Sequence, residues 1–157
     1  MLKDWEKYDV SRFTDPGCIP PEEGMHSKNA KKSELLYSTI EKDLIKLAGN
    51  EDVSNSIFLF HAPPYQTNLD RAALDGKSFE HVPLDVHIGS IAIKRFILDK
   101  QPLLTLHGHV HESARITGKW QDRIGNTVCF SAAHDDERLA LVIFNPDSLS
   151  SAIRTLL

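Results

Sequence analysis

The sequence has little cysteine, no long apolar run and no internal repeat. Its two cysteines, Cys18 and Cys129, lie far apart and form no C-x-x-C motif, so we expect structural thiols and a reducing compartment, the cytoplasm. No stretch approaches the roughly 18–20 apolar residues that a membrane span needs, and no apolar signal segment follows Met1. We therefore expect no membrane association.

The charge balance and the composition indicate an ordinary globular chain. The 18 basic and 22 acidic residues leave a net charge of −4, so no basic surface for a nucleic acid is evident. Hydrophobic residues make up 41% and charged residues 25% of the 157 positions, which are common values for globular proteins. A chain of this length is expected to form a single domain with a sizeable core.

The first 32 residues show no sustained hydrophobic period. Asp15-Pro16-Gly17 and Pro20-Pro21 are turn and polyproline signals. We therefore expect residues 1–32 to be irregular and to pack as a loop on something larger. Residues 33–157 are predicted to form the body of the domain.

An amphipathic helix is predicted at the start of this body. Ser33 is a suitable N-cap, and Gly49 is a suitable glycine just after the helix end. The apolar residues between them recur at helical spacing: Leu36, Ile40, Leu44 and Leu47. One face of this helix is expected to pack on a sheet.

The next segment predicts a β-α-β unit. Residues 56–60 form an apolar run, expected to be a buried, central strand, and the polar residues 66–83 form a loop. A helix is predicted over 89–100, followed by a strand at 103–107; its apolar positions include Ile91, Phe96 and Leu98. In such a unit both strands end at the same edge of the sheet.

After residue 111 the sequence indicates β-structure. A polar loop over 118–126 separates the first two of four predicted strands, which span 114–117, 127–130, 139–144 and 152–156. Helices and strands together predict an α/β fold.

The end of the 103–107 strand carries most of the candidate chemistry. The strand ends in His107, and Gly108 then leads to His109 and His111. Neutral imidazole is the commonest metal-binding side chain near neutral pH. Both rings of an extended H-x-H segment can project to one side, so His109 and His111 could reach one metal or two neighbouring metals. His61, directly after the first strand, is expected at the same edge.

These motifs resemble the C-terminal half of the calcineurin-like metallophosphoesterases. The sequence FHAPP at 60–64 is similar to the family's fourth motif, and LHGHVHES at 106–113 is similar to its fifth. The resemblance implies the C-terminal portion of an α/β/β/α sandwich and hydrolysis of phosphoric esters by metal-activated water. It also implies a two-metal site in which His61 and His109 bind one metal and His111 binds the other.

Three motifs of that family are missing from residues 1–60: D-x-H, G-D-x-x-D with its bridging aspartate, and G-N-H with an asparagine ligand and the catalytic histidine. The D-x-H at 85–87 and the G-N-T at 125–127 follow the fourth motif, so we interpret them as coincidental. We expect the chain to be the C-terminal part of a longer enzyme, an incomplete domain with weak activity alone or none. Its partners would be a phosphoester substrate and the missing N-terminal half or a second copy of the chain.

The implied cofactors are divalent ions of Mn, Fe or Zn, among which the sequence does not choose. Two alternatives remain open. One is a mononuclear hydrolase in which three histidines hold a single metal and water takes the fourth place. The other is a non-catalytic remnant of an enzyme that binds metal or a partner without turnover. An exposed sheet edge would be the structural sign of such a remnant.

Further candidates lie before and within the start of the 89–100 helix. His87 is a candidate catalytic residue at the substrate edge. Gly89 and Ser90 offer backbone N–H groups and the positive end of the helix dipole, which suit a phosphate, although a plain helix cap explains them equally well. Two metals bound by this chain alone would require a further ligand, one of Asp85, His87, Asp135 or Asp136.

Overall fold

The computed structural model describes residues 39–157. The chain divides after Asn50 into two compact units, Met1–Asn50 and Glu51–Leu157, whereas the predicted body began at residue 33. The irregular segment predicted for 1–32, together with the predicted cap at Ser33, lies outside the described residues.

The described part of the first unit is helix α3, Ile40–Ala48. The Thr39 hydroxyl caps it by accepting a backbone N–H of the first turn at 3.2 Å. Gly49, at φ 50°, ends the helix as predicted, because glycine adopts a positive φ without a steric penalty. Leu44 is buried, but Leu47 is 71% exposed, so the predicted apolar face is only partly correct.

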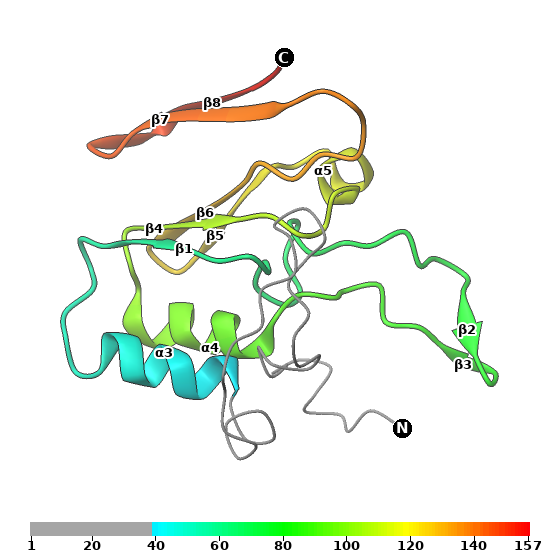
Figure 1. The fold of residues 1–157 in the computed structure, drawn as a ribbon, viewed down its shortest axis with the longest axis horizontal. Helices are drawn as coiled ribbons and strands as arrows, with labels where there is room; N and C mark the ends of the chain where they lie inside the picture. The colour runs from blue at the N-terminus through cyan, green and yellow to red at the C-terminus, as the bar shows by residue number, and fades with distance from the viewer. Residues whose placement is uncertain (1–38) are drawn as a thin grey trace, which may run out of the picture. The chain divides into compact units, whose positions relative to one another are not determined.

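The second unit is built on a four-stranded mixed sheet in the order β1-β4-β6-β5 (Figure 1). Its strands are β1 Ile57–Leu59, β4 Leu104–His107, β5 Gln121–Ile124 and β6 Thr127–Ser131. Strands β1, β4 and β6 run parallel, and β5 pairs antiparallel with β6. The predicted β-α-β unit and the mixed α/β class are confirmed.

Strand β1 is not the central strand that its apolar sequence predicted. It lies at the edge of the sheet and pairs with β4 alone among the described strands. Ile57 is 45% exposed and Leu59 is 82% exposed. An apolar run indicates that a strand is to be buried, but it does not identify the neighbours that would bury it.

Helix α4, Ile91–Lys100, covers one face of the sheet. Its Phe96 ring lies 4.9 Å from the Phe58 ring and 6.1 Å from the Phe60 ring, centroid to centroid. Leu98 points away from this contact and is 55% exposed, contrary to the prediction. The aromatic cluster fixes the helix against β1, directly before the first candidate histidine.

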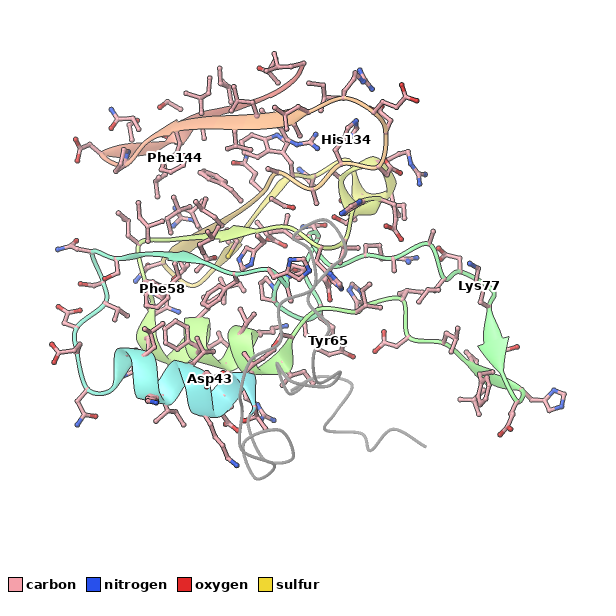
Figure 2. All side chains as sticks on the ribbon, in the orientation of Figure 1. Asp43, Phe58, Tyr65, Lys77, His134 and Phe144 are labelled. Atoms are coloured by element: carbon pink, nitrogen blue, oxygen red, sulfur yellow. The ribbon has the colours of Figure 1, made fainter. Side chains whose placement is uncertain are left out.

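A two-stranded hairpin covers the other face of the sheet. It consists of β7, Ala140–Asn145, and β8, Ser148–Leu156, and its Phe144 ring lies 5.7 Å from the Phe130 ring on β6 (Figure 2). Side chains on its outer face remain exposed, among them Leu141 at 40%, Ile143 at 53% and Ile153 at 55%. The unit therefore has three layers, helix, sheet and hairpin, with one apolar outer face uncovered within the described residues.

Residues 114–117 form helix rather than the predicted strand. Helix α5, Ser113–Thr117, ends at Gly118 with φ 69°, and β5 occupies part of the predicted loop 118–126. Alternating apolar and polar residues over only four positions do not distinguish one helical turn from a strand. The predicted loop 66–83 also contains a small hairpin, formed by β2 Ser78–Phe79 and β3 Val82–Pro83. No helix within 39–157 is long and apolar enough to cross a membrane.

Candidate functional site

The candidate histidines follow the C-terminal ends of β1 and β4. Because these strands are parallel neighbours, His61 and the 107–111 segment emerge at one edge of the sheet. The backbone N–H of Gly108 donates to the carbonyl of His61 at 3.1 Å. This bond fixes the two segments side by side.

His61 and His109 form a close pair. Nε2 of His61 lies 2.8 Å from Nδ1 of His109, and the ring centroids are 4.6 Å apart. Two nitrogens on one tetrahedral zinc, each about 2.0 Å from the metal, lie about 3.3 Å apart. The pair is thus within about half an ångström of the separation that a shared metal needs, and both side chains are exposed to solvent.

His109 has a strained backbone. Its φ of 69° lies in the left-handed region, where a residue other than glycine is disfavoured and is commonly found at functional sites. Val110, only 1% exposed, anchors the chain immediately after it. Partial burial and, next, the neighbouring His61 and His111 lower the pKa of His109, while Glu112 opposes this effect. The lowered pKa favours the neutral ring that a metal requires.

The third predicted ligand, His111, does not complete a three-ligand cluster. It is exposed, and it lies near enough to His109 to influence the pKa of that ring. Within residues 39–157, no group of three or more histidine, cysteine, aspartate or glutamate side chains is arranged to hold a metal ion. The structure thus brings two of the three predicted ligands together.

His107 has a structural role. It is 5% exposed; its Nδ1–H donates to the Ala62 carbonyl at 3.0 Å, and its Nε2 accepts from the Thr105 hydroxyl at 2.8 Å. Burial lowers the pKa of His107 to about 4, although the bond to Ala62 acts in the opposite direction. The neutral ring ties β4 to the residue after His61 and so positions the His61–His109 pair.

Asp70 is a site residue that the sequence did not reveal. Its carboxylate is fully buried and accepts four hydrogen bonds, from the N–H groups of Gln66 (2.8 Å), Thr67 (2.9 Å) and Gly89 (3.1 Å) and from Nδ1 of His87 (2.7 Å). A lone aspartate in a polar loop resembles any turn residue in the sequence. Only the folded loop gives it these four donors.

The phosphate site predicted at Gly89 and Ser90 is already filled by groups of the protein. The Gly89 N–H donates to Asp70, and the Ser90 N–H donates to the Pro63 carbonyl at 2.8 Å. The Ser90 hydroxyl accepts from the Ile93 N–H at 3.2 Å, which makes Ser90 the N-cap of α4. The Asp70 carboxylate, an anion of the protein itself, thus accepts the Gly89 N–H that was expected to bind a phosphate.

Gly89 is expected to tolerate no larger residue. A Cβ at this position would lie 2.7 Å from the Pro63 oxygen and 2.8 Å from the Pro64 carbonyl carbon. Gly89→Ala should therefore lower the free energy of unfolding by about 1–3 kcal/mol, measured by urea denaturation. The control is Gly108→Ala, whose Cβ meets only the His61 oxygen at 3.7 Å. Equal stabilities of the two variants would contradict the expectation.

All four remaining candidate metal ligands have other partners. Asp85 accepts from the Tyr65 hydroxyl at 2.7 Å, and Asp135 accepts from Nε of Arg115 at 2.7 Å. Asp136 pairs with Arg138, which is the main reason for its lowered pKa. The fourth, His87, is bound to Asp70.

Glu112, the residue after His111, is a second site residue that the sequence analysis did not single out. Its Oε1 accepts the Ala73 N–H at 3.1 Å, and its charge raises the pKa of His109. Glu112 directly follows His111 in the sequence, and this position could have identified it as a candidate site residue.

The comparisons with known proteins give two partial matches. No protein-family model matches the chain. It is 34% identical over 98 residues to an uncharacterized protein, MJ1162, of Methanocaldococcus jannaschii; the match covers 61% of this chain and 38% of that protein. A solved crystal structure matches at 20% identity with a TM-score of 0.42, over 74% of this chain and 36% of the other. The chain thus spans well under half the length of either protein.

Proposed function

We propose that the chain is part of a metal-dependent phosphoesterase, which hydrolyses phosphoric esters with metal-activated water. The observation that carries the proposal is the His61–His109 pair, whose nitrogens lie 2.8 Å apart at the end of two parallel strands. The sequence resemblance to the calcineurin-like metallophosphoesterases assigns these two side chains to one metal. His61 and His109 are 48 positions apart in the sequence, and two ligands of one metal must come this close together in the fold.

The layers of the second unit support the α/β/β/α sandwich of this family. Helix α4, the four-stranded sheet and the β7–β8 hairpin supply an α/β/β order (Figure 1). The exposed aliphatic side chains on the outer face of the hairpin, such as Ile143 and Ile153, are where a fourth, helical layer would pack. The proposal therefore treats the described residues as the C-terminal portion of the sandwich.

The edge strand β1 supports the same interpretation. Leu59 is 82% exposed on a strand whose outer edge has no partner among the described strands. Native proteins usually protect such an edge with charge, proline or a covering element. We propose that a further strand of the enzyme, beyond the described strands, pairs with β1.

The donor set fits a transition metal. Two neutral imidazoles at near-ligand separation suit Mn, Fe or Zn, and His111 stands beside them as a candidate ligand of a second ion. A bound metal pair would supply Lewis acidity toward a phosphoryl oxygen and a lowered pKa for the attacking water. Because imidazoles are neutral, they leave the charge of two divalent ions uncompensated. We therefore expect the chain by itself to hold one ion rather than two and to react slowly.

The two alternatives make different predictions for metal binding. A mononuclear three-histidine hydrolase needs His111 to converge with the pair, which is not the arrangement in residues 39–157. A non-catalytic remnant would bind metal through His61 and His109 without turnover. Turnover, measured for the chain alone and with the missing half added, therefore separates the three possibilities.

The test combines calorimetry and kinetics on the purified chain. Titration with Mn²⁺ should give close to one ion per chain, and 4-nitrophenyl phosphate should be hydrolysed well below the usual 1–1000 per second. Adding the part of the Methanocaldococcus jannaschii relative that the match leaves uncovered should raise the rate if the halves reassemble. Metal binding without any hydrolysis, alone or in the mixture, would favour the non-catalytic remnant.

A further inference from the structure

Asp70 and His87 form an ordered pair in the loop between β1 and α4. The Asp70 side chain is 0% exposed, and its Oδ1 lies 2.7 Å from Nδ1 of His87, whose side chain is 28% exposed. A buried carboxylate is stable only when its hydrogen bonds are satisfied, and three backbone N–H groups also bond to this one. The carboxylate is thus a fixed acceptor that cannot move away from the imidazole.

This arrangement sets the tautomer of His87. A carboxylate accepts hydrogen bonds, so Nδ1 of His87 carries the proton and donates it to Asp70. In the neutral ring Nε2 then carries no proton, and the ring hydrogen bond of His87 within residues 39–157 is the one from Nδ1 to Asp70. The His87 N–H donates to Oδ1 of Asp85 at 2.9 Å, which also holds the backbone in place. The ring is therefore held at Nδ1, its backbone is held by Asp85, and the side chain is partly open to solvent.

The pair is tied closely to the segment that carries His61. Gly89, two residues after His87, packs directly on the backbone of Pro63 and Pro64, and the Ser90 N–H donates to the Pro63 carbonyl at 2.8 Å. The Tyr65 N–H in turn donates to the Ser90 carbonyl at 3.1 Å, near the start of α4 (Figure 2). His61 precedes Pro63 by two residues, so short backbone connections link the two histidines.

We propose that His87 donates a proton to the leaving oxygen of the phosphoester, with Asp70 as its positioning residue, and that the substrates are esters of weakly acidic alcohols. The inference rests on the proposed phosphoesterase function. Water adds to phosphorus, the bond from phosphorus to the ester oxygen breaks, and Nε2–H of His87 protonates that oxygen to give the alcohol. The proton released by the water restores the imidazolium. The pair lies outside the motifs that carry the family resemblance.

The leaving group distinguishes a proton donor from a structural residue. Phenolate, with a pKa near 10 like that of Tyr, needs a proton as it leaves, whereas the more stable 4-nitrophenolate does not. With Mn²⁺ present, His87→Asn should slow hydrolysis of phenyl phosphate by about 100-fold or more. It should change hydrolysis of 4-nitrophenyl phosphate by less than about threefold. The matched control is His81→Asn, an exposed histidine of the same loop, which should affect neither substrate.

Asp70→Asn tests the positioning role. It should show the same selective loss on phenyl phosphate, and urea denaturation will report its effect on stability separately. Nitrogen-15 NMR of the metal-free wild-type chain should show the His87 proton on Nδ1, and Asp70→Asn should give a mixture of tautomers. This readout depends on neither metal nor turnover.

Each outcome decides the inference. Equal loss on both substrates in His87→Asn, no loss on either, or a neutral wild-type ring whose single proton is on Nε2 would overturn the dyad while leaving the phosphoesterase proposal in place. Chain that binds Mn²⁺ but hydrolyses neither substrate, both alone and with the missing half added, would overturn both. A selective loss in both variants, with the proton on Nδ1, supports both.

Discussion

His109→Ala is expected to weaken Mn²⁺ binding by more than about 100-fold and to abolish phosphoester hydrolysis. Loss of a residue that only supports a metal ligand already costs about 10–100-fold in affinity, so loss of a ligand should cost more. His61 alone would then remain of the pair whose nitrogens lie 2.8 Å apart. His61→Ala should give the same result, because the proposed site places both rings on one ion. Isothermal titration calorimetry with Mn²⁺ measures the affinity.

The backbone of His109 requires two controls. Because its φ is 69°, alanine there adds strain, whereas His109→Gly accepts this conformation and still lacks the ring. His81→Ala is the matched variant elsewhere, since His81 is also exposed and also has a φ of 69°. Only the variants at 61 and 109 should lose metal. Mn²⁺ affinity unchanged in His109→Gly would contradict the shared site.

Acid should destabilise the chain through His107. Its pKa is lowered to about 4 in the folded protein, against 6.5 for an unperturbed histidine. The unfolded chain therefore binds the proton first as the pH falls. The contribution of the neutral ring is complete above pH 6.5, is lost as the pH falls from 6.5 to 4, and changes no further below that. About 2.5 pKa units correspond to about 3 kcal/mol of unfolding free energy.

His107→Gln isolates this contribution. Other groups also titrate in this range, so the quantity to compare is the change in unfolding free energy between pH 7 and pH 4 for the two proteins. Urea denaturation at each pH provides it. The variant should be less stable at pH 7, where it loses the bonds to Ala62 and Thr105, and should lose about 3 kcal/mol less on acidification. Identical pH dependence in both proteins would show that His107 is not the titrating group.

The sequence by itself determined the local features and the edge where the histidines gather. Gly49 ends a helix, Ser90 caps one, and residues 104–107 form a strand, because each depends on φ preferences, on a nearby hydroxyl or on a run of apolar residues. The approach of His61 to His109 followed from the parallel order of their strands. Residues within one β-α-β unit are constrained by chain connectivity alone.

Only the tertiary structure decided which groups surround that edge. Strand β1 lies at an edge because sheet order depends on pairing between distant segments, which an apolar run does not record. His107 and His109 are two residues apart, yet burial makes one structural and exposure leaves the other as a candidate ligand. Asp70 meets Gly89 across 19 residues of polar loop, and no local pattern marks either as the other's partner. The packing of distant segments decides which side chains are buried and which groups they bond to. Burial and hydrogen-bond partners are what distinguish the roles of the histidines.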